Sequence, residues 1–441
     1  MRRQALVLVL ALGGAAALPA QAPAPLRLSF AEAVRRAVGS APAVTLAGLR
    51  TSEADARVRQ ARGALLPSLA LSGAWVNRDF NSDALGIPFP PQFSLPNPVP
   101  GFNNYDARVT ATQTLFDLSS VARVRAARAQ ANGSGAEEHL VVEGAAQTAG
   151  LTYLRAARAV ASAGARRADS SIAAELVRLA EAQKAAGVSA AIDVTRARTQ
   201  LVVAEGLLIV AQSETDRARI DLARALGIDP ATRIELSDTL ASSLGAADVP
   251  ADPDAALAQA AATRPDLLVE AARGIAARRT SSAIAAERLP RISLEGDYGV
   301  NGLTVPQALA TRQVALQVSL PILDGLRREG RLAEQDALAQ QSMVRERDLR
   351  QQVTAEVDVA LLDLRSASAQ QRIAAERLRL AEDELAQSRE RFAAGVAGNI
   401  EVINAQASLI QARDADIDAR FSAAVARVAL ARAVGVARTL H

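Results

Sequence analysis

The chain has 441 residues, half of them hydrophobic but only 3% aromatic, and its formal net charge is +3. This near balance gives no indication of nucleic-acid binding. The absence of cysteine excludes disulfides, thiolate metal sites and lipid attachment to a cysteine. Alanine supplies much of the hydrophobic half, which favours closely packed helices over a bulky globular core.

Residues 1–20 have the features of a secretory signal peptide. Arg2 and Arg3 precede the apolar run Leu6–Leu12, and the small-residue end Leu18-Pro19-Ala20 follows. The alternative is a membrane anchor, but the run is too short to span a bilayer as a helix. No later stretch has eighteen consecutive apolar residues. We therefore expect an exported chain without a transmembrane helix.

The first structured segments are a helix and a strand. Ser29 and Glu32 form a capping-box pattern, which predicts a helix that runs to about residue 64 with an interruption at Pro42. Alternation of polar and apolar residues predicts a strand over about 67–77.

The next segment, residues 77–104, is rich in proline, asparagine and glycine. Its prolines exclude regular structure and indicate an exposed loop. A proline-rich ligand for a partner is the alternative. A second alternating strand is predicted over about 105–116.

A proline-free helical pattern then covers about residues 118–186, roughly 100 Å at 1.5 Å per residue. Such a length is abnormal for a globular domain, where helices average about 11–12 residues, and it indicates a coiled-coil assembly. A turn at Gly187-Val188 leads to a helix over about 190–227, which residues 228–253 follow as a linker.

The second half repeats this plan. Asp254 is predicted to cap a helix that continues past Pro265 to Arg288. Strands are expected over about 290–300 and 312–322. Long helices are expected over about 325–394 and 400–434, with a turn at Gly395-Val396 between them.

The two halves, residues 21–253 and 254–441, align as an internal twofold repeat. One offset matches Pro42 with Pro265 and Pro67 with Pro290, and a second offset matches Gly187 with Gly395. The offset changes between the two strands, as expected when an insertion is confined to one loop.

The predicted strands each have one apolar and one polar face. Four strands do not close a barrel, and an open edge cannot persist in lipid. Three chains would supply twelve strands, an allowed even number. We therefore predict an α+β membrane protein: a homotrimeric twelve-stranded β-barrel continued by an α-helical coiled-coil tunnel. The alternative is a soluble β-sandwich edge that carries long helices.

In such a barrel the apolar faces meet lipid, with Trp75 and Tyr298 as interface anchors. The polar faces line water, and the predicted lumen-facing residues are Arg108, Thr110, Thr112, Glu295, Asp297 and Gln317.

Enzyme and metal chemistry find little support. His139 and His441 are the only histidines, one within a helical pattern and one terminal, and no phosphate-cradling glycine loop is present. Asp414, Asp416 and Asp418 have a calcium-like spacing, but their context is helical and the EF-hand glycine is absent. We expect no enzyme activity, no cofactor and no metal, so any driving energy must come from another protein.

The ordered and doubled motifs resemble the TolC-type outer-membrane efflux proteins over essentially the whole mature length. These motifs are Arg264-Pro265-Asp266-Leu267, a Leu-Pro that opens each strand pair, Phe116-Asp117 and Leu323-Asp324 after the pairs, and Arg391–Val396 leading to Ile400-Glu401-Val402. The resemblance implies a homotrimeric channel-tunnel in the outer membrane and periplasm. It implies a periplasmic adaptor and an inner-membrane transporter as partners. The apolar strand faces add outer-membrane lipid, and the balanced charge gives no nucleic-acid partner.

The chain departs from the best-known members of the family near the second tip. Ala397 aligns with a basic residue that helps to lock their tunnel, and Asn404 stands where they can carry an acid.

The tips are the predicted functional sites. Gly187, Val188, Gly395 and Val396 are predicted to dock the adaptor, although plain turn glycines would give the same pattern. Asp193, Glu401 and Asn404 are candidates for the pore constriction, where carboxylates would favour cations. The alternative is that Asp193 and Glu401 only complement a helix dipole.

The sequence leaves two rival functions open. Type I protein secretion needs the same duct as efflux, and the adjacent genes would distinguish the two. A non-conducting coiled-coil structural protein or adhesin is the other rival, and conduction in planar bilayers would reject it.

Overall fold

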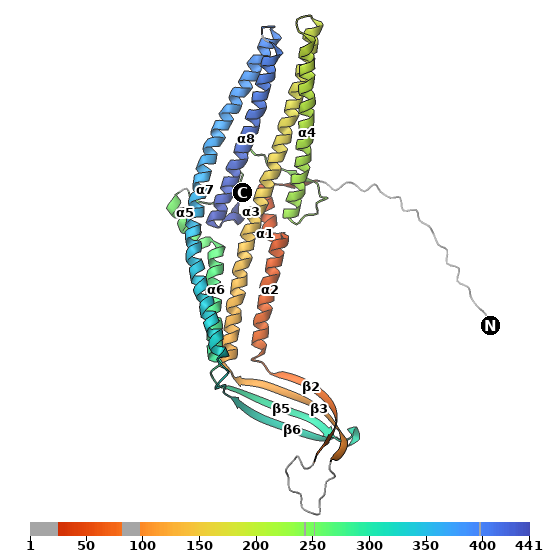
Figure 1. Cartoon of the computed structure of the whole chain (residues 1–441), viewed down its shortest axis with the longest axis vertical. Helices are drawn as coiled ribbons and strands as arrows, with labels where there is room; N and C mark the ends of the chain where they lie inside the picture. The colour runs from red at the N-terminus through yellow and green to blue at the C-terminus, as the bar shows by residue number, and fades with distance from the viewer. Residues whose placement is uncertain (1–24, 82–97, 242–243, 251, 397) are drawn as a thin grey trace, which may run out of the picture.

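The computed structural model describes residues 25–81, 98–241, 244–250, 252–396 and 398–441. The predicted signal peptide, Ala397 and most of the loop over 77–104 lie outside these residues. Long helices form a rod that carries a sheet at one end and two hairpin turns at the other (Figure 1). Among the described helices, none is both long and apolar enough to cross a membrane.

The first half of the chain contains six main elements. They are α1 (Phe30–Ser40), α2 (Pro42–Gly63), β2 (Ser68–Phe80), β3 (Val99–Phe116), α3 (Leu118–Ala185) and α4 (Ala191–Ala225). Ser29 caps α1 by accepting a hydrogen bond from the Glu32 amide at 3.2 Å. Pro42 begins α2 at a position where its missing N–H has no helical partner to lose.

The second half repeats the same order. Its elements are α5 (Pro253–Thr263), α6 (Pro265–Ala286), β5 (Arg291–Gly302), β6 (Leu309–Ser319), α7 (Arg327–Ala393) and α8 (Asn399–Val434), with short 3₁₀ turns η2 (Val305–Gln307) and η3 (Ala437–Thr439). The matched helices have 11 and 11, 22 and 22, 68 and 67, and 35 and 36 residues. This agreement shows the internal twofold repeat in the fold itself.

The helices lie side by side in one layer. Towards the hairpin turns the order is α7, α8, α3, α4, because α8 contacts both α7 and α3, and α3 contacts α4 (Figure 1). Towards the sheet the order is α7, α6, α3, α2. α7 and α3 run the whole length, so they hold the two halves of the rod together.

The sheet has four antiparallel strands in the order β2-β3-β5-β6. β2 and β6 are its two edges. The long helices begin where β3 and β6 end, and Asp117 caps α3 by accepting hydrogen bonds from the Ser119 and Ser120 amides. Asp324 accepts from the Arg328 amide at 3.1 Å, so the aspartate of each repeated motif stabilises the start of a long helix.

Four sequence predictions differ from the structure. The first strand continues to Phe80 and the second begins at Val99, so both extend into the segment that its prolines were expected to keep free of regular structure. Pro100 lies near the start of its strand, where a missing N–H is tolerated. Asp254 is not the cap of the second-half helix: Asp252 accepts from the Ala255 amide, and Asp254 lies in the first turn. That helix also ends before Pro265, because a proline disfavours helical geometry in the residue that precedes it. The strand expected over 312–322 instead begins at Leu309 and ends at Ser319.

The middle of the rod contains a further small sheet that the sequence did not indicate. β4 (Ile234–Leu236), within the predicted linker, pairs in parallel with β1 (Leu26–Leu28). Beneath it the ring of Phe30 packs edge-on against that of Tyr153, with centroids 5.6 Å apart. The Tyr153 hydroxyl donates to the Leu28 carbonyl at 3.0 Å. This layer ties β1, near the start of the described residues, to the long helix α3.

Arg264 explains the Arg-Pro-Asp-Leu motif. Its side chain is only 3% exposed and pairs with Asp266 and with Glu356 of α7. It also donates to the Ala433 carbonyl at the end of α8, at 3.2 Å. A β-carbon on Gly435 would lie 3.0 Å from the Arg264 α-carbon, which makes glycine necessary there. The motif therefore joins α5, α6, α7 and α8.

Candidate pore face and hairpin tips

The strand register puts the six predicted lumen residues on one face of the sheet. Thr110 lies opposite Asp297, and Thr112 opposite Glu295. Gln317 lies opposite Ser293, two residues from Glu295 on the same face. Arg108 precedes Thr110 by two residues. That this polar face lines a lumen stays a prediction.

Arg108 is the centre of a charged cluster on this face. Its guanidinium pairs with Asp106 on its own strand and reaches Asp297 on β5 at 3.1 Å. Asn301 donates to Asp106 Oδ2 at 3.1 Å, an oxygen that the Arg108 guanidinium also contacts. The cluster joins two neighbouring strands. Sequence reasoning missed Asp106 and Asn301 because only the register shows that they meet Arg108.

The opposite face of the sheet is apolar and exposed. Leu71 is 82% exposed and Val314 is 78% exposed, although both belong to regular strands. Trp75 lies opposite Tyr105, and Tyr298 lies opposite Val109 and Arg312 on this same face. An apolar surface of this extent needs lipid or a partner to cover it.

Both hairpin turns are closed by a left-handed glycine and the same pair of backbone hydrogen bonds. Gly187 has φ +75° and Gly395 φ +71°, the left-handed region that favours glycine. The Gly187 amide donates to the Lys184 carbonyl, and the Val188 amide to the Gln183 carbonyl at 3.0 Å. Gly395 and Val396 repeat both bonds at the end of α7. Val188 and Val396 project outward, 73% and 74% exposed.

The three constriction candidates have different surroundings. Asp193 accepts hydrogen bonds from the Ser189 hydroxyl at 2.9 Å and the Ala190 amide at 3.3 Å, so its side chain caps α4. Glu401 caps nothing; it lies 3.5 Å from the Arg391 guanidinium and is partly exposed. Asn404 is exposed on α8. Glu401 is therefore freer than Asp193 to face a pore, and pore-lining stays a prediction for all three.

Two hydrogen bonds that the sequence did not reveal join the tips. Asn399, buried at the start of α8, donates to the Asp193 carbonyl at 3.0 Å. Gln183, near the end of α3, donates to the Phe392 carbonyl at 2.9 Å. Buried Phe392 and Val402 pack with Leu176 of α3 beneath these bonds. Within one chain the two hairpins are thus tied at the tip as a unit.

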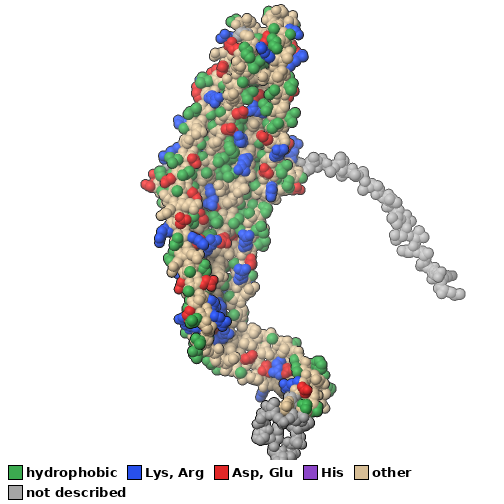
Figure 2. Space-filling model, viewed as in Figure 1, with side chains coloured by type: hydrophobic (Ala, Val, Ile, Leu, Met, Phe, Trp, Pro, Cys, Tyr) green, Lys and Arg blue, Asp and Glu red, His purple; other side chains and the backbone are tan. Residues whose placement is uncertain are grey.

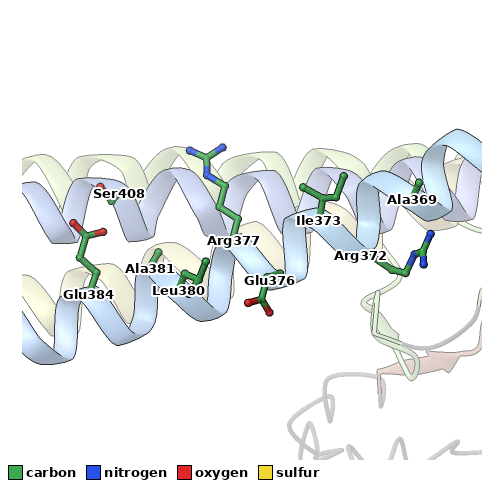
Figure 3. A pocket seen from close by; sticks show the side chains of 9 residues that line it. All are labelled: Ala369, Arg372, Ile373, Glu376, Arg377, Leu380, Ala381, Glu384 and Ser408. Atoms are coloured by element: carbon green, nitrogen blue, oxygen red, sulfur yellow. The ribbon is translucent and has the colours of Figure 1, made fainter.

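An open groove of about 790 Å³ runs along α7, with Ser408 of α8 at its border (Figure 3). Its apolar part includes Ile373 and Leu380, both exposed. Arg372 and Glu376 lie on the same helix beside them (Figure 3). α4, at the other edge of the layer, also exposes apolar side chains, namely Val202, Val203, Ile209 and Val210. Both lateral edges of the rod are therefore suited to contact another helix.

The aspartates with calcium-like spacing diverge into three ion pairs. Asp414 pairs with Arg166, Asp416 with Arg420 and Asp418 with Arg158. His139 is exposed on α3. Over the described ranges there is no group of three or more His, Asp or Glu side chains arranged to hold a metal ion.

Comparison with known proteins identifies the family. The family model described as outer membrane efflux protein matches residues 33–228 and 256–436, most of the chain. This chain belongs to the outer membrane efflux protein family. The resemblance inferred from the doubled motifs is therefore confirmed, and family and fold are those of outer-membrane channels.

Similar proteins agree with this membership. The chain is 28% identical over 395 residues to Protein CyaE of Bordetella pertussis, an alignment that covers 88% of this chain and 79% of that one. The outer membrane protein VceC of Vibrio cholerae has a TM-score of 0.71 at 19% identity, over 92% and 96% of the two chains. The Campylobacter jejuni CmeC outer membrane channel has a TM-score of 0.77 at 16% identity, over 92% and 86%. These structures share the fold of this chain.

Proposed function

We propose that three copies of this chain form a closed channel-tunnel, a passive exit duct from the periplasm through the outer membrane. The observation that carries this proposal is the pair of open edges, β2 and β6, on a sheet with one exposed apolar face. In lipid both edges need partners, because unpaired backbone groups cost several kcal/mol each. Pairing β6 of one copy with β2 of the next supplies them and closes a twelve-stranded barrel.

The helical rod supports the same closure. α7 and α4 form opposite edges of its layer and both expose apolar side chains. A copy that places α4 against α7 of its neighbour repeats one head-to-tail contact, which closes into a ring when the rotation fits. Three layers of four helices then make a tube continuous with the barrel. The groove along α7 would be covered by that neighbour.

The tips would meet the rest of an efflux system. Over the described residues no group of His, Asp or Glu side chains is arranged to hold a metal ion, and the family works within efflux systems. We propose that Gly187, Val188, Gly395 and Val396 contact a periplasmic adaptor, and that an inner-membrane transporter drives transport through it. A β-carbon on Gly187 or Gly395 would meet nothing within 4 Å in the chain, so space for a partner exists there.

Two experiments test the proposal. Purified protein should migrate as a trimer in detergent and conduct ions in planar bilayers. A monomer, or a trimer without conductance, would reject the duct and favour a non-conducting structural protein. For docking, Gly187→Leu and Gly395→Leu should leave trimers intact but abolish efflux and crosslinking to the co-expressed adaptor. Gly325→Leu, at an exposed glycine with φ +69° and open space before α7, is the matched control. Crosslinking that survives in both tip variants would place docking elsewhere.

A further inference from the structure

A pocket of about 610 Å³ lies where the sheet joins the helices. It is lined by residues from the end of α6, the start of β5, the end of β6 and the starts of α3 and α7. Figure 2 shows basic side chains gathered at this junction on the visible face of the molecule. The pocket belongs neither to the tips nor to the charged cluster around Arg108.

The lining is unusually rich in arginine. Five arginines and three carboxylates contribute, which leaves an excess of two positive charges. The carboxylates already have partners. Asp117 accepts from the Ser119 and Ser120 hydroxyls at 2.6 Å, and Glu287 pairs with Arg331. Burial alone would raise the pKa of Asp117, but these hydroxyls, the Ser120 amide and nearby Arg123 lower it to about 2, so it is ionised at neutral pH.

Arg328 is the residue in the pocket without adequate partners. Its side chain is only 7% exposed, yet its nearest carboxylate oxygen, on Asp324, is 3.8 Å away. Its Nε has no hydrogen-bond partner. A buried guanidinium with an unsatisfied donor is costly, because the group has lost water without gaining an equivalent acceptor. A bound anion with several oxygens would supply that acceptor.

Two more arginines can reach the same ligand. Arg327 donates through Nε to the Asp324 carbonyl and forms no ion pair with a described carboxylate within 4 Å. Arg291 is exposed and lies 3.5 Å from Asp117. The first turns of α3 and α7 begin at this junction, and the positive ends of their dipoles also favour an anion.

The register fixes the side on which the pocket opens. Arg291 lies opposite Ser319, and both line the pocket. Arg291 is separated from Ser293, Glu295 and Asp297 by even numbers of residues, so it shares the polar face of the sheet. An occupant therefore approaches from the polar face, where water-borne solutes are, and not from the apolar face that meets lipid.

We propose that this junction pocket binds phosphate-like oxyanions of solutes inside the duct, through Arg328, Arg327 and Arg291. Guanidinium groups recognise such anions by paired, charge-assisted hydrogen bonds. The location inside a duct rests on the function proposed above, but binding of an anion does not. In a trimer the three pockets form an anion-attracting belt, in contrast to the acidic residues at the tips.

The binding test uses the full chain in detergent, titrated with inorganic phosphate by calorimetry at fixed ionic strength. Wild type should bind saturably. Arg328→Gln should weaken binding about tenfold or more, the loss of one charged hydrogen bond. Arg291→Gln with Arg327→Gln removes two exposed arginines and should do the same, which keeps the test valid if Arg328→Gln does not fold. Arg350→Gln, which removes an exposed arginine paired with Glu346 on α7, is the matched control.

Two further readouts separate the alternatives. Phosphate should raise the melting temperature of wild type and of Arg350→Gln but not of Arg328→Gln; a purely structural arginine would give no such difference. Incorporation into phosphatidylglycerol rather than phosphatidylcholine nanodiscs should leave the phosphate affinity unchanged. A phosphatidylglycerol-dependent loss would assign the pocket to a lipid headgroup and overturn the solute site. Absence of saturable binding, or equal affinity in all variants, would also overturn it.

Measurements of ion conduction provide an independent test of the pocket's location. Phosphate added to one side of a bilayer should reduce chloride current through wild type and have less effect on the Arg291→Gln, Arg327→Gln variant. If the protein does not conduct at all, the proposed duct fails while the calorimetric result still decides the site. If it conducts and binds phosphate without any effect on chloride current, the pocket does not face the lumen.

Discussion

The assignment of the two sheet faces can be tested by placing a charge at graded depths along β6. Val314 is the central residue of the eleven in this strand, and Leu316 and Val318 lie two and four residues further on the same apolar face. Gln317, between them, points to the polar face. Substituting arginine at each of these four positions tests which face of the strand meets lipid, at nearly the same place in the chain.

The expected magnitudes follow from the geometry. A strand rises about 3.3 Å per residue, so Leu316 lies about 7 Å and Val318 about 13 Å from Val314 along the strand. At a tilt of about 45° these separations become about 5 and 9 Å in depth. Arginine on the lipid face costs about 2–4 kcal/mol at the midplane and about 0–1 kcal/mol near the interface. We therefore expect Val314→Arg to destabilise most, Leu316→Arg somewhat less, Val318→Arg least, and Gln317→Arg to be nearly neutral.

The assay is reversible unfolding of the protein from lipid vesicles in denaturant, with the yield of trimer on gels as a second measure. The decisive comparison is Leu316→Arg with Gln317→Arg, because adjacent residues share depth and strand but not face. Equal losses in the two variants would refute the assignment of faces. Equal losses at Val314 and Val318 would refute the depth of the strand in the membrane.

Three further predictions concern the tips, the junction and the middle of the rod. In a salt gradient the Asp193→Asn, Glu401→Gln variant should shift the reversal potential away from cation selectivity, since acid rings favour cations; an unchanged potential would leave only the cap of α4. The folded-state pKa of Asp117, about 2, lies below the usual 3.8, so this group stabilises the fold above about pH 4 and the contribution fades as the pH falls towards 2. Asp117→Asn should abolish that dependence in acid melting curves and cost about 2 kcal/mol at neutral pH, the equivalent of the lowered pKa. An unaltered acid profile would contradict the ionised cap. Arg264→Met should lower the free energy of unfolding by about 3–5 kcal/mol, because Asp266 and Glu356 lose a buried partner. Thermal unfolding measures this loss, and a value under about 1 kcal/mol would show that the motif is dispensable for folding.

Local patterns in the sequence predicted much of the fold. Alternation alone assigned Thr110 and Gln317 to one face, because a strand places every second residue on the same side. The tip glycines were identifiable because a helix that ends in a left-handed residue prefers glycine. The cap at Asp252 was misplaced because Asp254 also precedes helical residues, and Pro253 between them suits the first helical position better than an interior one.

The contacts that give the candidate sites their chemistry were not predictable in this way. Arg328 has the sequence context of an ordinary polar residue at a helix start, and its burial appears only in the folded chain. The bonds from Gln183 and Asn399 join residues more than two hundred positions apart in the chain. β1 and β4 have three residues each, too few for any periodicity to register. Non-local pairing decides these features, and a single sequence gives no direct signal of it.

The equal lengths of the repeated helices have a mechanical consequence. α3 and α7 both begin at the sheet, each next to an aspartate that holds its first turn, and they differ by one residue, 68 against 67. At 1.5 Å per residue the lengths of the two helices differ by about 2 Å, and the hydrogen bonds from Gln183 and Asn399 hold the two tips level with each other. The bonds from Gln183 and Asn399 require this level register, because a shift of even one helical turn would move donors about 5 Å from their acceptors. In a trimer six such tips would form a flat rim. In the proposed duct, a partner that contacts every copy in the same way needs such a rim, and the nearly equal lengths of α3 and α7 supply it.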